Sequence, residues 1–171
     1  MEKYIDYYKT QEFFNDKNCI VTGATGGVGS LLVNVLCELN AKVVAFVKDE
    51  KKFINMFRPQ LDNKKLLYEV IDFTKNEPAE KFKSAAMKLN GKIDHIFLCH
   101  GKYNSGKLEQ ITLEEYDNFI NINTRSLMNI ISLATPLTLT PKDANSRAEH
   151  CINWLTIDLV IVLINPDLIG M

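Results

Sequence analysis

CIVTGATGGVGS, residues 19–30, places a short apolar run directly before four glycines within seven positions. Apolar side chains then recur at helical spacing from Leu31 to Leu39. A strand, a glycine-rich turn and a helix N-terminus together favour a bound phosphate, because unpaired N–H groups and the helix dipole both attract an anion. The alternative is a loop whose glycines only let the helix pack closely against the sheet.

Apolar runs and helical periodicities alternate along the rest of the chain. The run 42–47 is apolar on both faces, as expected of a parallel strand covered by helices. This alternation predicts an α/β fold, a doubly wound parallel sheet of the Rossmann type. The expected strands are 19–21, 42–47, 66–71 and 93–99, and the expected helices are 31–39, 51–57, 82–89 and a long helix from the Thr112–Glu115 capping box to Pro136.

Composition limits the classes of function. A chain of 171 residues, 46% hydrophobic, is predicted to form one domain over 1–171, with 1–16 as an N-terminal extension. The net charge of −1 argues against nucleic acid as a partner, and the apolar runs are too short for a membrane span. Four scattered cysteines without a CxxC pair indicate reduced thiols, a cytoplasmic location and no metal site.

The glycine spacing points to one family. The loop reads Thr22-Gly23-x-x-x-Gly27-x-Gly29, which fits neither the P-loop pattern nor GxGxxG. It resembles the cofactor loop of the short-chain dehydrogenase/reductase family. The resemblance implies a nicotinamide dinucleotide as cofactor, with these candidate binding residues: Thr22, Gly23, Thr25, Gly27, Val28, Gly29, Lys48, Asp72 and Gly101.

Two later positions support this resemblance. Asp72 follows the third expected strand, where the family has an aspartate near the adenine amine; the alternative role is a loop cap. Residues 93–101, IDHIFLCHG, are similar to the family's strand-four motif NNAG, of which only Gly101 is kept. His100 stands near the carboxyl edge of the sheet and could touch the nicotinamide, but we interpret it as a surface-loop histidine.

The residues after the second expected strand favour NADP over NAD. A carboxylate there usually holds the ribose 2′-hydroxyl, whereas a 2′-phosphate calls for a cation. Val47 occupies the carboxylate position and Lys48 follows it, so Lys48 can pair with a phosphate. Asp49 is the alternative, as a ribose acceptor for NAD, if the strand ends later.

The candidate catalytic residue is Asn123. INTRS, residues 122–126, resembles the family segment that carries the catalytic asparagine, and Asn123 falls on the expected apolar stripe of the long helix. A buried amide needs a partner, which in the family is a water relay to a lysine. Asn121 is a rival on another face, and a purely structural amide is the other interpretation.

The rest of the family's catalytic set is not found. A strand with the catalytic serine and a Tyr-x-x-x-Lys helix would stand between Pro136 and Ala148, where the chain is too short for both. The matching register gives Asp143 and Arg147 in place of tyrosine and lysine. Tyr103 and Lys107 have the right spacing, but Asn-Ser-Gly between them is typical of a turn, so we interpret this match as coincidence.

The resemblance therefore implies a fold that is incomplete on its C-terminal side, shortened internally and at its end. We expect an NADP-binding oxidoreductase type, with a small carbonyl or alcohol as substrate and impaired turnover in this chain. The alternative is a non-catalytic dinucleotide-binding or interaction protein, and a third is a fragment that scarcely folds. A homo-oligomer is compatible with either of the first two.

Overall fold

A four-stranded parallel sheet forms the centre of the molecule. The computed structural model describes residues 12–62, 64–75, 78–102 and 108–138. The strands β1 (Asn18–Thr22), β2 (Lys42–Val47), β3 (Leu66–Val70) and β4 (His95–Leu98) lie in the order β3-β2-β1-β4. Each neighbouring pair is parallel, so the carboxyl ends of all four strands meet at one edge of the sheet.

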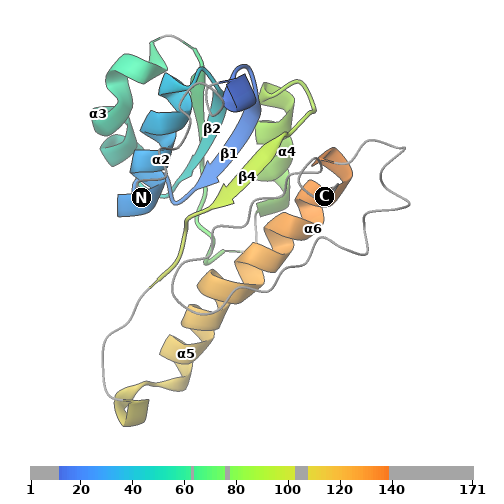
Figure 1. The fold of residues 1–171 in the computed structure, drawn as a ribbon. Helices are drawn as coiled ribbons and strands as arrows, with labels where there is room; N and C mark the ends of the chain where they lie inside the picture. Colours follow the sequence, from blue (N-terminus) through green and yellow to red (C-terminus); the bar gives the residue numbers. More distant parts are fainter. Residues whose placement is uncertain (1–11, 63, 76–77, 103–107, 139–171) are drawn as a thin grey trace, which may run out of the picture.

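Helices cover both faces of this sheet (Figure 1). α2 (Gly27–Glu38) and α3 (Glu50–Leu61) pack on one face, and α4 (Pro78–Lys88) and α6 (Ser126–Thr138) pack on the other. Alternate residues of β2 enter the two cores: Val43 and Ala45 face α2 and α3, whereas Val44 and Phe46 face α4 and α6. Both faces of the strand are buried, which explains its continuous apolar run and confirms the predicted doubly wound fold.

Residues 108–138 form one long helical arm. It begins with a short 3-10 turn, η1 (Leu108–Gln110), and continues through α5 (Leu113–Ile120), a π-turn η2 (Asn121–Arg125) and α6. The predicted capping box at its start is confirmed. The Glu115 amide donates to Thr112 Oγ1 at 3.2 Å, and the Thr112 amide donates to Glu115 Oε2 at 2.9 Å.

Two predicted helix ends are wrong, both at prolines. α3 continues past Arg58-Pro59 to Leu61, because Phe57 leaves helical geometry (φ −122°, ψ 19°) and this kink accommodates the proline ring. Leu61 packs against the core and so holds the last turn in place. α6 likewise includes Pro136 and ends at Thr138, two residues beyond the predicted end.

The apolar stripe predicted along the arm is confirmed only for α6. Of the predicted stripe, Ala134 is buried against α4 and the sheet, and Leu127 and Ile131 pack against the same core. α5 buries none of its residues, and Tyr116 is 55% exposed. The π-turn separates the two helices, because its i→i+5 hydrogen bonding shifts the helical register by one residue. A stripe drawn at constant helical spacing therefore does not survive across residues 121–125.

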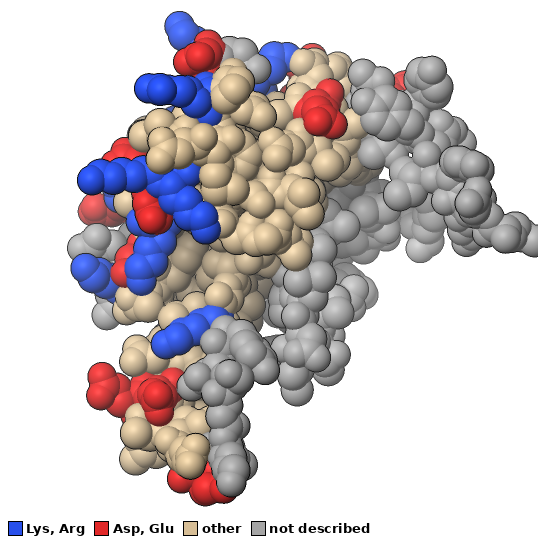
Figure 2. Space-filling view, turned by 90° about the vertical axis from the view of Figure 1, so that its left-hand side faces the viewer, with Lys and Arg blue, Asp and Glu red and all other residues tan. Residues whose placement is uncertain are grey.

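The surface charge and the state of the cysteines agree with what the composition predicts. Basic and acidic side chains intermingle on the face shown in Figure 2, so no field of one sign forms there. Within the described part of the chain, Cys19 is buried, Cys37 and Cys99 are half-buried, and all three are free thiols. Cys151 lies outside the described residues. None of the helices in the described ranges is long and apolar enough to cross a membrane.

Candidate functional site

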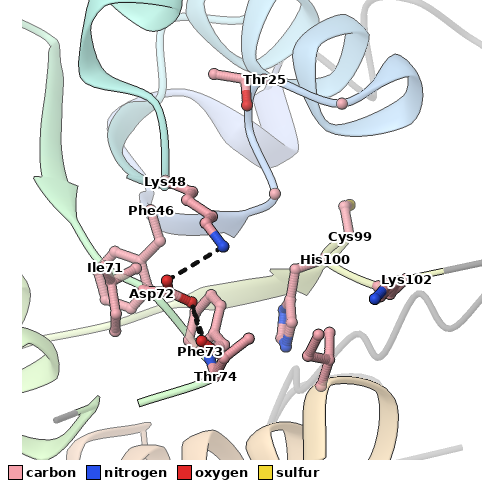
Figure 3. A pocket seen from close by; sticks show the side chains of 14 residues that line it. Thr25, Phe46, Lys48, Ile71, Asp72, Phe73, Thr74, Cys99, His100 and Lys102 are labelled. Carbon is pink, nitrogen blue, oxygen red and sulfur yellow. Dashed lines mark hydrogen bonds and ion pairs between the residues drawn. The ribbon is translucent and has the colours of Figure 1, made fainter. Parts of the chain in front are cut away.

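A cavity of about 350 Å³ opens at the carboxyl edge of the sheet (Figure 3). The loops that follow all four strands contribute to it, together with the π-turn. Such an edge is where ligands bind in open α/β sheets. The lining residues are Gly23, Thr25, Gly26, Phe46, Lys48, Ile71, Asp72, Phe73, Thr74, Cys99, His100, Gly101, Lys102 and Ile122.

Two loop glycines are required by close packing of backbone. Gly23 has a φ of +63°, and a Cβ there would lie 2.6 Å from the carbonyl oxygen of Cys99. A Cβ on Gly29 would lie 2.3 Å from the carbonyl oxygen of Gly23. These contacts are far inside van der Waals distance, so both glycines let the loop fold against β4 and the first turn of α2.

Gly27 differs from those two glycines. A Cβ built on Gly27 meets no atom of the described residues within 4 Å, so packing in this chain does not require a glycine there. It is the first residue of α2, whose N-cap is Gly26, without a side-chain hydrogen bond and without an acidic residue in the first turn of that helix. The amides and the positive end of the helix dipole are therefore open to an anion.

The predicted loop residues divide into three groups. Gly23 and Thr25 line the cavity, as does Gly101 after β4. Gly27, Val28 and Gly29 form the first turn of α2 beside the cavity rather than its lining, and Val28 is 41% exposed. Thr22 lies fully buried under the loop.

Lys48 and Asp72 come together on the β2–β3 side of the cavity. Lys48 Nζ lies 3.1 Å from Asp72 Oδ2, and both residues are part of the lining (Figure 3). Asp72 also accepts hydrogen bonds from the Thr74 amide at 3.0 Å and the Thr74 hydroxyl at 2.6 Å. Burial acts to raise the pKa of Asp72, but these hydrogen bonds and Lys48 outweigh it and hold the pKa below its usual range.

The alternative ribose acceptor is engaged elsewhere. Asp49 is the N-cap of α3 and accepts a hydrogen bond from the Lys52 amide at 2.9 Å. It is not among the lining residues, and Val47 is buried in the core. Lys48 is thus the charged side chain directly after β2 that reaches the cavity. Asp72 both caps its own loop, through Thr74, and lines the cavity.

His100 is not a surface-loop residue, so that interpretation is wrong. Its Nδ1 lies 2.7 Å from Thr22 Oγ1, and its Nε2 lies 2.7 Å from Ser126 Oγ. Phe73 stacks on the ring, with centroids 4.0 Å apart and an interplanar angle of 20°. Burial lowers the pKa of His100 to about 4, so the ring is neutral at physiological pH.

The side chain of Asn123 binds backbone. Its Oδ1 accepts from the Lys102 amide at 2.7 Å, and its Nδ2 donates to the Lys102 carbonyl at 2.8 Å. Asn123 is half-buried, and each polar atom of its amide has one partner. These bonds fix the loop that carries Gly101, whose Cβ would come within 3.1 Å of Asn123 Oδ1. The rival Asn121 instead accepts a hydrogen bond from Arg125 at 2.6 Å.

Sequence reasoning missed several wall residues. Phe46, Phe73 and Ile122 add apolar side chains to the lining, and Lys102 adds a second cation. Phe73 could have been found from its position directly after the candidate residue Asp72. Ile122 reaches the cavity from the π-turn, which the sequence did not predict. Tyr103 and Lys107, as well as Asp143 and Arg147, lie outside the described residues. In the described ranges, no group of three or more metal-ligating side chains comes together.

The chain is similar in sequence to curated bacterial oxidoreductases. An uncharacterized oxidoreductase of Listeria monocytogenes is 27% identical over 141 residues, which cover 82% of this chain and 57% of the relative. An uncharacterized oxidoreductase of Staphylococcus aureus is 28% identical over 142 residues, with coverage of 83% and 59%. The chain therefore spans a little over half the length of these relatives.

Solved structures share the fold. A short chain dehydrogenase from Mycobacterium smegmatis superposes with a TM-score of 0.65 at 23% identity, over 72% of this chain and 52% of that one. A short-chain dehydrogenase/reductase from Brucella melitensis gives 0.65 at 20% identity, over 73% and 53%. A family model described as short chain dehydrogenase matches residues 17–146.

Proposed function

Since the chain belongs to the short-chain dehydrogenase family, we propose that its cavity binds a nicotinamide dinucleotide, NADP(H) in preference to NAD(H). The observation that carries the proposal is the open space over Gly27 beside the uncapped N-terminus of α2. Packing does not explain this glycine, whereas close approach of a pyrophosphate to the backbone does. The residues present therefore fit the cofactor.

The cavity wall suggests a role for each candidate residue. Gly23, Thr25 and the first turn of α2, with Gly27, Val28 and Gly29, would hold the pyrophosphate. Asp72 would accept a hydrogen bond from the adenine amine, and Gly101 allows the chain after β4 to pass close to the ligand. The bound nicotinamide supplies or accepts a hydride.

Preference for the 2′-phosphate rests on Lys48. Its side chain is 70% exposed and is held by a single carboxylate in the described structure, so it can turn from Asp72 towards a phosphate. No acidic side chain directly after β2 lines the described cavity, which removes the usual holder of a free ribose 2′-hydroxyl. A dianionic phosphate next to an ammonium gains more than a hydroxyl does.

The experiment is a titration of the purified chain with NADPH and NADH, followed by cofactor fluorescence and by quenching of Trp154, the one indole of the chain. We expect NADPH to bind more tightly, and Lys48→Ala to remove this preference while leaving NADH binding within twofold. Lys52→Ala, on the exposed surface of α3, is the matched charge control. If the folded chain ignores both dinucleotides at millimolar concentration, the proposal is wrong.

For the reaction, we propose that the parent type oxidises a small alcohol or reduces a small carbonyl, and that this chain does so slowly or not at all. Asn123 is the candidate catalytic residue, but its side chain holds the Lys102 backbone in the described structure. A phenol with an ordinary pKa near 10 needs a neighbouring cation to act at neutral pH. The register 143–147 offers aspartate and arginine instead.

This register also supports a second function, a non-catalytic dinucleotide-binding or interaction protein. Turnover of broad carbonyl substrates with NADPH separates the two: a measurable rate favours the enzyme, and tight binding without a rate favours the binding protein. A rate abolished by Tyr103→Phe would show that our interpretation of that motif is wrong. The homo-oligomer, the single domain over 1–171 and the cytoplasmic location stay predictions.

A further inference from the structure

The His100 side chain contacts three separate segments of the chain around the cavity. It lies on the chain after β4, its ring nitrogens contact Thr22 at the start of the glycine loop and Ser126 at the start of α6, and its ring face contacts Phe73 after β3. In the family motif an alanine usually stands here, which could make none of these hydrogen bonds. The histidine is therefore a feature of this chain rather than of the motif.

The hydrogen bonds around His100 have only one consistent direction. Thr22 Oγ1 already accepts the amides of Cys99 at 3.0 Å and His100 at 3.3 Å, so its own proton is free to be donated. Its distance to His100 Nδ1 is 2.7 Å, against 3.4 Å to the Phe97 carbonyl, and the shorter contact wins. Thr22 thus donates to Nδ1.

The other end of the ring agrees with this direction. The Ser126 hydroxyl donates to the Ile122 carbonyl inside the π-turn, so Ser126 Oγ must accept from His100 Nε2–H. The hydroxyl protons of Thr22 and Ser126 and the Nε2 proton of His100 then each form one hydrogen bond. The ring is neutral, with its proton on Nε2. A protonated ring would also donate from Nδ1 to Thr22 Oγ1. That oxygen has two lone pairs, and both already accept backbone amides.

A serine–histidine pair also occurs in nucleophilic active sites, but the details exclude that role here. Ser126 is 3% exposed and does not line the cavity, so a substrate in this cavity has no path to its hydroxyl. Its proton is also directed to a backbone carbonyl rather than to the histidine. The pair connects elements and does not attack a substrate.

We propose that His100, as a neutral Nε2–H imidazole, is a positioning residue that locks the glycine loop to the π-turn of the helical arm and so sets the shape of the dinucleotide cavity. The connection runs from Thr22 through His100 and Ser126 to Ile122, which lines the same cavity. Phe73 fixes the ring plane from the third side. The readout on dinucleotide affinity rests on the proposed function; the readout on the tautomer does not.

Ser126→Ala is the decisive variant, because this residue touches His100 and not the cavity. We expect Ser126→Ala and His100→Ala each to weaken dinucleotide binding by about three- to tenfold, the range of one lost hydrogen bond. In the His100→Ala background, Ser126→Ala should change affinity by less than twofold, because the connection is already broken. His100→Gln, which can donate to Ser126, should recover part of the affinity. Additive losses, or wild-type affinity in Ser126→Ala, would overturn the proposal.

Long-range ¹H–¹⁵N NMR of the imidazoles tests the tautomer without any cofactor, with His100 assigned by its absence in His100→Gln. We expect one protonated nitrogen, Nε2, and an acceptor Nδ1 at neutral pH. An Nδ1–H tautomer or a charged ring would refute the proposal even if the dinucleotide binds. If the tautomer is as expected but the wild-type chain binds no dinucleotide, the proposed function fails and the structural lock stands.

Discussion

Two glycines of the same loop should respond in opposite ways to one added methyl group. In Gly29→Ala, the new Cβ would lie 2.3 Å from the Gly23 carbonyl oxygen and 2.8 Å from its carbonyl carbon. Both atoms are backbone, in a loop fixed by the Gly23 contact with Cys99, so they cannot turn away as a side chain would. Overpacking of this kind costs about 1–3 kcal/mol. For a domain of this size, that corresponds to a fall in Tm of roughly 2–12 °C.

In Gly27→Ala, the Cβ enters open space at the first position of α2. Alanine is favoured over glycine in a helix by up to about 1 kcal/mol, so the free energy of unfolding should stay equal or rise slightly. The methyl group would, however, occupy the space that we assign to the pyrophosphate. We expect dinucleotide binding to weaken by about tenfold or more, the effect of roughly 1.4 kcal/mol.

The assay is urea unfolding of both variants and the wild type, paired with NADPH titration of the same preparations. Gly27→Ala should separate affinity from stability, whereas Gly29→Ala should lose both. If Gly27→Ala unfolds at a clearly lower urea concentration, the space over Gly27 is not open. If it binds NADPH as the wild type does, the pyrophosphate does not approach this glycine, and the single observation behind the proposed function is lost.

Three further outcomes follow from the described geometry. Folding lowers the pKa of His100 from 6.5 to about 4, so the contribution of this residue to stability is complete above pH 6.5 and is lost as the pH falls towards 4, by about 3 kcal/mol. In His100→Gln, the midpoint of urea unfolding should therefore depend less on pH between 6.5 and 4 than in the wild type. Parallel curves of midpoint against pH would contradict the buried neutral ring. Lys64 has a φ of 60°, so Lys64→Gly should raise the free energy of unfolding by about 0.5–1 kcal/mol while Lys64→Ala should not; a gain in both would point to the charge instead. Thr112→Ala removes the capping box of a helix that buries no residue, so amides of α5 should exchange with solvent faster by a factor of about five, the effect of about 1 kcal/mol; unchanged exchange would mean that contacts other than the cap hold α5.

The parts of the fold that sequence predicts well are those with local causes. β2 is bounded as expected at 42–47, since a strand buried on both faces must be apolar throughout. The capping box needs only the side chains of Thr112 and Glu115 and the intervening turn. The glycine loop is likewise readable because the backbone around Gly23 and Gly29 leaves no room for a Cβ.

The parts that sequence misses depend on distant contacts. The partners of His100 are 78 and 26 residues away, and no local pattern brings Thr22 or Ser126 to the ring. The continuation of α3 past Pro59 depends on Leu61 packing against the core. The π-turn has no periodicity of its own, since it adds a single residue to an otherwise regular helix.

That single added residue decides which way a whole surface faces. At 3.6 residues per turn, each position advances the helix by about 100°. Deleting one residue from 121–125 would rewind the arm and rotate α5 by about that angle relative to the sheet. The outward row of Leu113, Tyr116 and Phe119, exposed by 83%, 55% and 39%, would then point elsewhere without any change in its own sequence. The chemical character that this end of the molecule presents to its surroundings is thus encoded several residues away, in how tightly the backbone coils.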